Sequence, residues 1–420
     1  MKNANREKHV LENIRDTAFC MLKDTAGVFR FPFVVPGAGY EQDLWDWDSY
    51  WSGYALSDIV EYFRDDPVFD YAGRREKLLA HLEGNVLNFL DNAEPDGFIP
   101  GTITVGGLFS TLLRDTHRNG EPVNQAKPFL CAQALRIARR YGETEWVREG
   151  LPKLAAYLDY YRAHQYHEPT GLYVWATDIM IGMDNNPTVF GRPYGSTADI
   201  YLNSFLYNEL NSAAELFRMA GRPDANKYAV WATELKDSIN RYLWDERDGF
   251  YYSADLLVRD PSTTYFHHGM KPFWNVLPMK IRMWPGFLPM MYGISDERQN
   301  ERLIAHACDP AFACDFGIRT LAKDERMYTI VKTSNPSNWL GPVWLVANYC
   351  LFEGFLRAGR RDLAEDMKDK TVRLLGMDIE KTGHMSESYI PETGEPMMYS
   401  GFLNWDCLAV SMIRELEEKG

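Results

Sequence analysis

The sequence predicts an all-α fold, an (α/α)6 barrel in which six helical hairpins close into a ring. Helical periodicity and helix-stop signals indicate roughly twelve helices in 420 residues. The connections between them alternate between short and long. If consecutive helices are antiparallel, all the long connections lie at one end of the ring. Because one repeating pattern runs through residues 1–420, we expect a single domain, although at about 150 residues per domain the length would suggest two or three.

The expected helices cover most of the chain. They lie near residues 4–23, 46–63, 72–90, 124–141, 145–165, 197–219, 224–242, 285–292, 296–307, 340–358, 362–376 and 402–418. Four of the short connections share one pattern: a glycine suited to a left-handed helix C-terminus, then Thr, Asp or Ser to cap the next helix. These connections are 142–144, 221–224, 293–295 and 359–362, and a slightly longer one lies around 65–67.

The long connections are the expected location of function, because long loops in a compact protein are usually functional. They cover residues 24–45, 91–123, 166–196, 243–284, 308–339 and 377–401. Two of them contain β-hairpin signals, at 171–176 and at 243–253 with a turn at Asp248-Gly249. An open helical solenoid is the alternative fold, but beyond the tight turns the chain shows no internal repeat.

Composition excludes several classes of partner. The net charge of −14 and the pI of about 5.2 disfavour nucleic acid and anionic lipid. No apolar run approaches the ~18 residues that a membrane span needs. The N-terminal residues lack the apolar stretch of a secretory signal, so we expect a cytoplasmic protein. The six scattered cysteines are expected to be reduced core thiols. We expect no metal and no cofactor; the sequence does not indicate the oligomeric state.

Aromatic residues are abundant, with 12 Trp, 24 Tyr and 22 Phe. Burying Trp and Tyr requires partners for their polar atoms, so a surplus of both favours a surface that stacks on sugar rings. The densest cluster lies at residues 42–51, where the second helix begins. An acidic residue such as Asp46 is also expected at a helix N-terminus for electrostatic reasons alone. The candidate sugar-binding residues here are Trp45, Trp47, Asp48, Tyr50 and Trp51.

Two further segments combine amides with charged or aromatic side chains. Residues 119–128 lead into the fourth helix, where Asn124, Gln125 and Lys127 either bind a ligand or cap the helix. Residues 334–344 repeat a theme of amide and indole. The candidates in this second segment are Asn338, Trp339, Gly341 and Trp344.

Asp184 is the candidate general acid. It follows the apolar run 179–183, and partial burial by Met and Ile raises the pKa of a carboxyl, as a general acid at neutral pH requires. An Asp in an Asx-turn before Asn-Pro is the structural alternative. Asp178, Asn185 and Arg192 lie in the same loop and are candidate substrate-binding residues.

Glu387 is the candidate second carboxylate, which general acid catalysis of hydrolysis requires as a partner. It lies beside Tyr389, in the long connection that leads to the last helix. Tyr389 and the following Trp405 are candidate substrate-binding residues.

In their order along the chain, these motifs resemble those of trehalases and of glycoside hydrolase family 63. Residues 47–51 resemble the tryptophan-aspartate signature, and residues 182–187 resemble the loop that carries the general acid. Residues 338–344 and 387–394 are similar to the Trp-x-Gly-Pro-x-Trp and base-bearing segments, and 199–203 to the Asp-Leu-Asn stretch. The matches extend from about 40 to 405.

The resemblance implies an (α/α)6 barrel and an inverting α-glycosidase, nearest the compact mannosylglycerate and glucosylglycerate hydrolases. Asp184 would protonate the leaving oxygen, and Glu387 would activate water on the opposite face. The chain departs from the family at Met180, where the relatives usually have a substrate-holding Glu. This departure puts the identity of the substrate in doubt, and Asp178 is a candidate substitute.

Three alternatives remain at this point. A trehalase would share the motifs. An N-acyl sugar 2-epimerase would share the barrel but needs paired histidines, and the chain has one adjacent pair, His267-His268. A non-catalytic sugar-binding protein would keep the tryptophans without needing Asp184 and Glu387. Arg118, Lys127, Arg192 and Arg282 could bind a charged leaving group such as glycerate, or could be structural.

Overall fold

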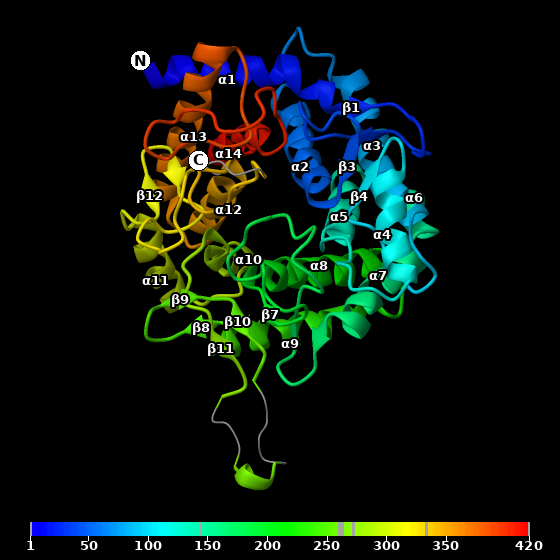
Figure 1. The fold of residues 1–420 in the computed structure, drawn as a ribbon. Coiled ribbons are helices and arrows are strands. Elements are labelled where there is room, and N and C mark those ends of the chain that lie inside the picture. Colours follow the sequence, from blue (N-terminus) through cyan, green and yellow to red (C-terminus); the bar gives the residue numbers. More distant parts are fainter. Residues whose placement is uncertain (1, 143, 259–263, 271–273, 332–334, 419–420) are drawn as a thin grey trace.

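Twelve helices form two concentric rings in the computed structural model, which describes residues 2–142, 144–258, 264–270, 274–331 and 335–418 (Figure 1). Neighbouring helices of the inner ring pack against each other, and the last one packs on the first, so the ring is closed. The predicted (α/α)6 barrel is therefore confirmed. The inner helices are α2 (Asp46–Tyr62), α5 (Leu130–Tyr141), α8 (Ile200–Met219), α10 (Leu288–Tyr292), α12 (Leu345–Arg357) and α14 (Leu408–Glu418). The outer helices are α1 (Lys2–Thr17), α3 (Tyr71–Asp91), α7 (Leu151–His164), α9 (Ala225–Tyr242), α11 (Glu297–Cys308) and α13 (Arg361–Thr382).

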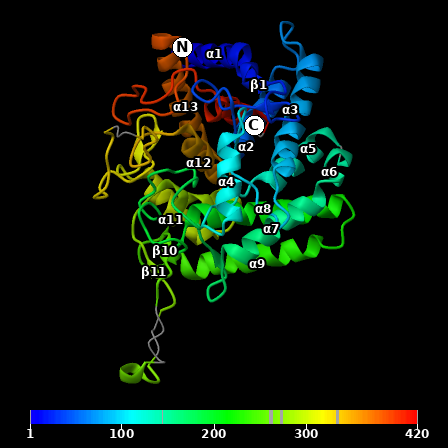
Figure 2. The same ribbon diagram turned by 45° about the vertical axis from the view of Figure 1, so that its right-hand side comes forward.

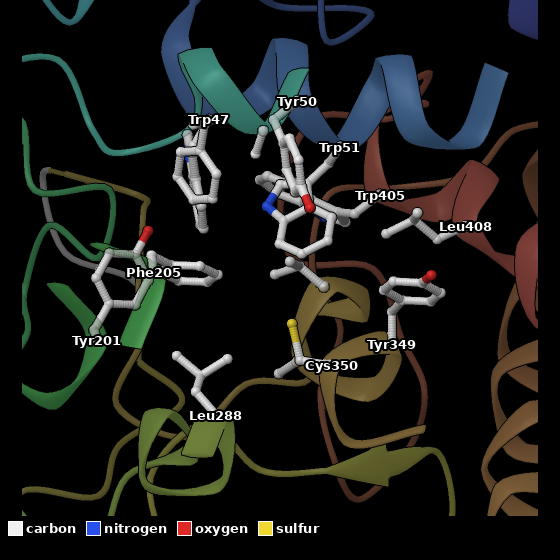
Figure 3. Packing of buried hydrophobic residues seen from close by; sticks show 14 of the residues in the cluster. Trp47, Tyr50, Trp51, Tyr201, Phe205, Leu288, Tyr349, Cys350, Trp405 and Leu408 are labelled. Carbon is white, nitrogen blue, oxygen red and sulfur yellow. The ribbon is translucent and has the colours of Figure 1, made fainter. Parts of the chain in front are cut away.

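The burial pattern explains which helices lie inside. Most residues of α2 and α12 are buried on every face, as expected of a helix surrounded by others. The outer helix α9 instead buries a single stripe at helical spacing, which includes Tyr228, Ala232 and Leu235. Large side chains of the inner helices meet in the middle of the ring (Figure 3), where the ring centroid of Trp51 lies 6.2 Å from Phe205 and 5.9 Å from Tyr349.

The glycines of the short connections have the predicted backbone, but the caps differ. Each of the four has a positive φ, from 67° at Gly293 to 78° at Gly142. In the described residues, Thr144 and Asp224 cap nothing with their side chains, and Asp224 instead pairs with Arg222, two residues earlier. The remaining two predicted caps are also wrong. Asp296 rather than Ser295 caps α11, through a capping box with Gln299, and Asp362 pairs with Arg360.

Two helices were not anticipated. The predicted helix 145–165 is divided into α6 (Glu145–Arg148) and α7, because Pro152 lacks a backbone N–H and starts a new helix. The long connection 91–123 contains α4 (Leu108–Arg118), which buries only Ser110 and Leu113. Leu108, Phe109, Leu112 and Leu113 do recur at helical spacing, but this run is short and most of it stays exposed in the structure.

The strands are short, and most of them lie in the predicted long connections. Two fall inside the ends of the predicted helices 4–23 and 197–219, because α1 ends at Thr17 and α8 begins at Ile200. The predicted hairpin 243–253 is confirmed by β8 (Trp244–Asp245) and β9 (Phe250–Tyr251), with Gly249 at φ 71° in the turn. The second signal corresponds to β5 (Tyr166–His167) and β6 (Leu172–Tyr173). Other pairs join different parts of the chain: β3 (Asp43–Trp45) with β4 (Thr102–Thr104), β1 (Leu22–Lys23) with β2 (Phe33–Val34), and β12 (Ala313–Cys314) with β13 (Gly317–Ile318). A three-stranded sheet has the order β11 (Leu277–Pro278), β10 (Ala254–Asp255), β7 (Thr197–Ala198).

One short element lies well away from the ring. The 3-10 helix η2 (Tyr265–His267), which follows β10, projects far from every other element (Figure 2). It carries the adjacent histidines His267 and His268, and both side chains are exposed.

The cysteines are all free, but the prediction that they lie in the core is only half right. Cys131, Cys350 and Cys407 are buried, whereas Cys20 and Cys308 are exposed and Cys314 is half-buried. Within the described ranges, no helix combines the length and the apolar character that crossing a membrane requires.

Candidate active site

A cavity of about 430 Å³ lies where the inner helices begin. Each long connection leads from an outer helix to an inner one, so the long connections and the inner N-termini meet at this end of the ring. The lining residues come from both sources and include most of the chemically unusual clusters of the sequence. They are Tyr40, Trp45, Trp47, Asp48, Lys127, Asp178, Ile179, Met180, Gly182, Asp184, Phe190, Asn335, Pro336, Ser337, Trp339, Trp344, Glu387, Met398, Tyr399 and Trp405.

Four tryptophans form a continuous aromatic wall in this cavity. Trp339 stacks on Trp344 with ring centroids 3.9 Å apart. Trp47 lies 5.8 Å from Trp339 and 5.5 Å from Trp405, and Figure 3 shows both Trp47 and Trp405 near the N-terminal part of α2. Indole faces cover the apolar face of a sugar ring, so this wall can hold one pyranose.

Asp184 lies half-buried in the loop between β6 and β7. Burial raises the pKa of its carboxyl, while hydrogen bonds from Ser337 and Asn335 and the charge of Lys127 lower it; the net direction is upward. A carboxyl in this environment retains its proton to higher pH than an exposed Asp does, which suits a proton donor.

Glu387 lies on another long connection and is buried among aromatic side chains. The Tyr40 hydroxyl donates to its carboxyl, with Tyr40 Oη 3.2 Å from Oε1, and Trp405 Nε1 donates to its backbone oxygen at 3.2 Å. Burial raises the pKa of Glu387 well above its usual value. The charges of Asp48 and Asp184 add to that shift, whereas the Tyr40 hydrogen bond opposes it.

Asp48 is a third carboxyl in the same cavity, on the first turn of α2. Asn404 Nδ2 donates to its Oδ1 at 2.6 Å. Burial raises the pKa of Asp48 to about 7, against the attraction of Lys127. Three carboxyls this close do not all ionise together near neutral pH, because each charge disfavours the others.

Lys127 is the one cation among the lining residues, and it is already paired. Its Nζ lies 2.7 Å from Oδ1 of the fully buried Asp46 and donates to the Met180 carbonyl at 3.2 Å. Among the described residues, Met180 is the single non-glycine residue with a positive φ, 65°. This strained backbone turns the Met180 carbonyl toward the ammonium group.

Comparison with known proteins identifies the family. Residues 80–405 match the family described as mannosylglycerate hydrolase MGH1-like glycoside hydrolase domain. The chain belongs to this family. The resemblance to family 63 that the motifs indicated is thereby confirmed.

The curated relatives of this MGH1-like chain are distant. The mannosylglycerate hydrolase of Rubrobacter radiotolerans is 24% identical over 178 residues, which are 42% of this chain and 36% of that protein. The trehalase of Homo sapiens is 21% identical over 296 residues, 58% of this chain and 45% of that protein. The chain therefore spans less than half the length of these relatives.

Solved structures share the fold of this MGH1-like chain over nearly all of its length. The family 63 mannosylglycerate hydrolase of Thermus thermophilus in complex with glucose has a TM-score of 0.66 at 20% identity, covering 96% of this chain and 98% of that one. The neutral trehalase of Saccharomyces cerevisiae has a TM-score of 0.62 at 14% identity, covering 98% and 82%. At these identities the likeness shows the fold alone.

Several of the predicted site residues lie behind the cavity wall rather than in it. Asn124 donates to the backbone oxygens of Thr177 and Ile179 and so holds the loop that leads to Asp184. Asn185 connects the same loop to the tryptophan segment, because it accepts from Trp339 N at 2.8 Å and donates to Asn338 Oδ1 at 3.0 Å. These amides hold the loops in place.

The remaining predicted residues that do not line the cavity also have structural partners. Gln125 bonds the backbone of Ile99 and Gly97, and Arg192 pairs with Asp255 at 2.7 Å. Tyr50 and Trp51 pack in the core beside Phe129. Tyr389 donates to Asp378, and Gly341 has a φ of 144° with Tyr328 packed against its Cα. The structure thus brings Trp45, Trp47, Asp48, Lys127, Asp178, Asp184, Trp339, Trp344, Glu387 and Trp405 into one cavity, and not the other predicted residues.

Sequence reasoning missed several lining residues, chiefly Tyr40, Phe190, Met398 and Tyr399. Tyr40 and Tyr399 are neighbours, with ring centroids 5.2 Å apart, because Gly37 pairs with Phe402 across a backbone bridge. The surplus of Tyr was the one available signal, and it does not identify individual residues. In the described part of the chain, no group of three or more His, Cys, Asp or Glu is arranged to hold a metal ion.

Proposed function

We propose that the protein hydrolyses a small α-linked glucoside or mannoside, with inversion at the anomeric carbon. The observation that carries the proposal is the position of Asp184 and Glu387. They come from distant parts of the sequence, yet both residues line one cavity, together with five tryptophans. Paired carboxyls beside a sugar-binding surface are the machinery of glycosidases.

In the proposed step, Asp184 donates its proton to the glycosidic oxygen while Glu387 takes a proton from water. The water oxygen bonds to the anomeric carbon as the bond to the leaving oxygen breaks, and the leaving group departs as an alcohol. Inverting enzymes keep these carboxyls about 6.5–9.5 Å apart, so that the water fits between Glu387 and the sugar. Trp47, Trp339 and Trp405 would pack on the ring, and Asp48 and Lys127 would bind its hydroxyls.

The two roles require opposite protonation states. The raised pKa of Asp184 supports a proton donor. The raised pKa of Glu387 works against a base, since only the ionised carboxylate accepts a proton, and the Tyr40 hydrogen bond partly offsets this. We therefore expect activity to rise with pH until Glu387 ionises, and to fall again when Asp184 loses its proton.

Epimerisation is disfavoured by the location of the histidines. Sugar 2-epimerases of this fold need histidines beside the substrate, but none of the residues that line the cavity is a histidine. The adjacent pair His267-His268 lies at the projecting η2. A protein that only binds sugar would gain nothing from burying Asp184 and Glu387, because burying a carboxyl is costly.

A trehalase remains the second candidate, because trehalases of Homo sapiens and Oryctolagus cuniculus are among the curated relatives.

The experiment that tests the proposed function is a reducing-sugar assay on trehalose, kojibiose, glucosylglycerol, glucosylglycerate and mannosylglycerate. It compares wild type with Asp184→Asn and Glu387→Gln. Each variant should lose about 10²–10⁴ in kcat. Asp237→Asn, an exposed change on α9, is the matched control and should act as wild type. If either active-site variant released reducing sugar with a kcat within about tenfold of wild type, the assigned roles would be refuted.

A further inference from the structure

The charge of the cavity bears on what kind of leaving group it accepts. Its lining carries four carboxyls, from Asp48, Asp178, Asp184 and Glu387, against the single ammonium of Lys127. That ammonium is neutralised at 2.7 Å by Asp46, which is fully buried and accepts hydrogen bonds from the backbone of Trp47 and Lys127 as well. Whichever carboxyls are ionised, the described residues that line the cavity carry no positive charge in excess.

The other cations that the sequence offered for an anionic ligand are also engaged elsewhere. Arg118 pairs with Glu94 at 2.8 Å, Arg192 pairs with Asp255 at 2.7 Å, and Arg282 pairs with Asp324. None of these three arginines is among the lining residues. Within the described residues, an anionic leaving group would therefore find no arginine to bind it in this cavity.

Helix N-termini are the other common anion-binding groups, and three of those at this end of the ring already hold carboxylates of the protein. Asp46 and Asp48 lie on the first turn of α2. Glu209 accepts from the Cys131 and Ala132 amides at the start of α5, and Asp199 accepts from Tyr201 N at the start of α8. At these three helices an incoming carboxylate would compete with a carboxylate of the protein rather than fill an empty site.

The outer part of the cavity is apolar and aromatic instead. Ile179, Phe190 and Tyr399 line it and are strongly exposed, with Phe190 60% exposed. Large apolar side chains kept accessible at the mouth of a polar cavity are suited to stacking on a ring.

We infer that the leaving group is an uncharged ring, a neutral sugar or an aryl alcohol, rather than a small carboxylate such as glycerate. The inference rests on the proposed hydrolase function and names the substrate class of the same site. Ring stacking at Phe190 and Tyr399 supplies attraction for such a group, while the lining carboxyls repel an anionic one.

The test compares matched glycosides that differ in one group. Glucosylglycerol and glucosylglycerate share a skeleton and differ in CH2OH against a carboxylate, and trehalose, kojibiose and p-nitrophenyl α-glucoside add a neutral ring. The mannosyl counterparts are measured in parallel.

We expect kcat/KM for the neutral glycerol compound to exceed that for the glycerate compound by about tenfold or more. We expect kcat/KM for the ring-bearing compounds to be higher than for the glycerol compound. A glycerate compound that is hydrolysed as well as the neutral ones would overturn the inference while leaving the hydrolase function intact. No turnover of any compound would instead overturn the hydrolase function itself.

Two variants separate charge from stacking. Asp178→Asn keeps an oxygen that can accept from Gly191 N, now at 2.8 Å, but removes a charge, so the ratio of glycerate to glycerol turnover should rise. Phe190→Ala should lower the ratio of ring-bearing to glycerol turnover by about threefold to tenfold. If neither ratio moves, the lining does not select the leaving group and the inference is wrong.

Discussion

Tyr40 donates a hydrogen bond to Glu387, with Oη 3.2 Å from Oε1, although the two residues lie at opposite ends of the sequence. This bond stabilises the ionised form of Glu387, the form that accepts a proton from water. It acts against burial and against the neighbouring carboxyls, which favour the protonated form.

The variant Tyr40→Phe should therefore shift the acidic limb of the kcat/KM profile to higher pH. A hydrogen bond to a charged group is worth about 1.5–3 kcal/mol, and a pKa unit corresponds to about 1.4 kcal/mol, so we expect a shift of about one to two pH units. Tyr399→Phe is the control, because its ring lies beside Tyr40 and no hydrogen bond joins its hydroxyl to Glu387 among the described contacts. An acidic limb that stays in place in Tyr40→Phe would contradict this role.

Asp48→Asn should move the same limb in the opposite direction. The charge of Asp48 raises the pKa of Glu387, so removing it lets Glu387 ionise at lower pH. The side-chain oxygen of Asn can still accept the hydrogen bond from Asn404 Nδ2, which now lies 2.6 Å from Asp48 Oδ1. We also expect KM to rise, because an amide accepts hydrogen bonds from sugar hydroxyls less strongly than a carboxylate does. A shift to higher pH would show that Asp48 does not act on Glu387.

Gly341→Ala should displace the backbone segment that carries two of the four wall tryptophans, Trp339 and Trp344. Gly341 has a φ of 144°, and an added Cβ would lie 2.5 Å from Cε2 of Tyr328. The segment that carries Trp339 and Trp344 must then move, and we expect kcat/KM to fall by about tenfold or more. Gly359→Ala is the control: its φ of 73° imposes backbone strain of about 1 kcal/mol, but nothing lies within 4 Å of its Cβ. Equal activity losses in the two variants would argue against this cause.

The ring leaves local signals in the sequence, whereas the choice of Asp184 and Glu387 as a pair depends mainly on the order of the motifs that resemble family 63. Helical periodicity and the glycines at 142, 221, 293 and 359 are read from neighbouring residues, and so is the apolar run before Asp184. The caps were less predictable. Asp224 and Asp362 each have an arginine two residues earlier, and the ion pair competes with capping for the same carboxylate.

The mouth of the cavity could not be predicted, since it depends on contacts between distant segments. Tyr40 meets Tyr399 through the bridge between Gly37 and Phe402, and no spacing in the sequence reveals that pairing. Asn124 and Asn185 were correctly associated with the site region, but an amide that holds a loop and one that binds sugar have the same appearance in a sequence. Only the position of the side chain distinguishes the two.

Asp58 lies near the C-terminal end of α2, away from the cavity, and provides a test of what stabilises the fold. Its Oδ1 accepts from Arg136, Arg140 and Arg414, at 3.2, 2.8 and 2.7 Å. Burial alone raises the pKa of Asp58, but the arginines outweigh burial, and the net direction is downward. Asp58→Asn leaves these cations without their shared anion, so we expect a loss of about 3 kcal/mol at neutral pH.

The pH dependence of that loss follows from the lowered pKa. The ionised carboxylate stabilises the fold at pH values above its unfolded pKa of about 3.9, and this contribution disappears as the pH falls through the lower folded pKa. The difference in Tm between wild type and Asp58→Asn should thus be largest near neutral pH and shrink toward pH values near 3. Asp362→Asn, at an exposed pair with Arg360, should leave Tm unchanged. A difference in Tm that does not vary with pH would contradict the account.

The central claim is hydrolysis with inversion, in which Asp184 is the acid and Glu387 the base. The most direct measurement follows the newly released sugar by ¹H NMR in the first minutes of reaction, before mutarotation. The substrate is the best α-glycoside of the panel whose leaving group is not itself a reducing sugar, because trehalose and kojibiose also release a leaving glucose with an anomeric signal of its own. We predict that the β-anomer appears first, and that Asp184→Asn and Glu387→Gln release neither anomer at a comparable rate. Initial appearance of the α-anomer would contradict the inverting mechanism, because that product requires a covalent intermediate and two displacements.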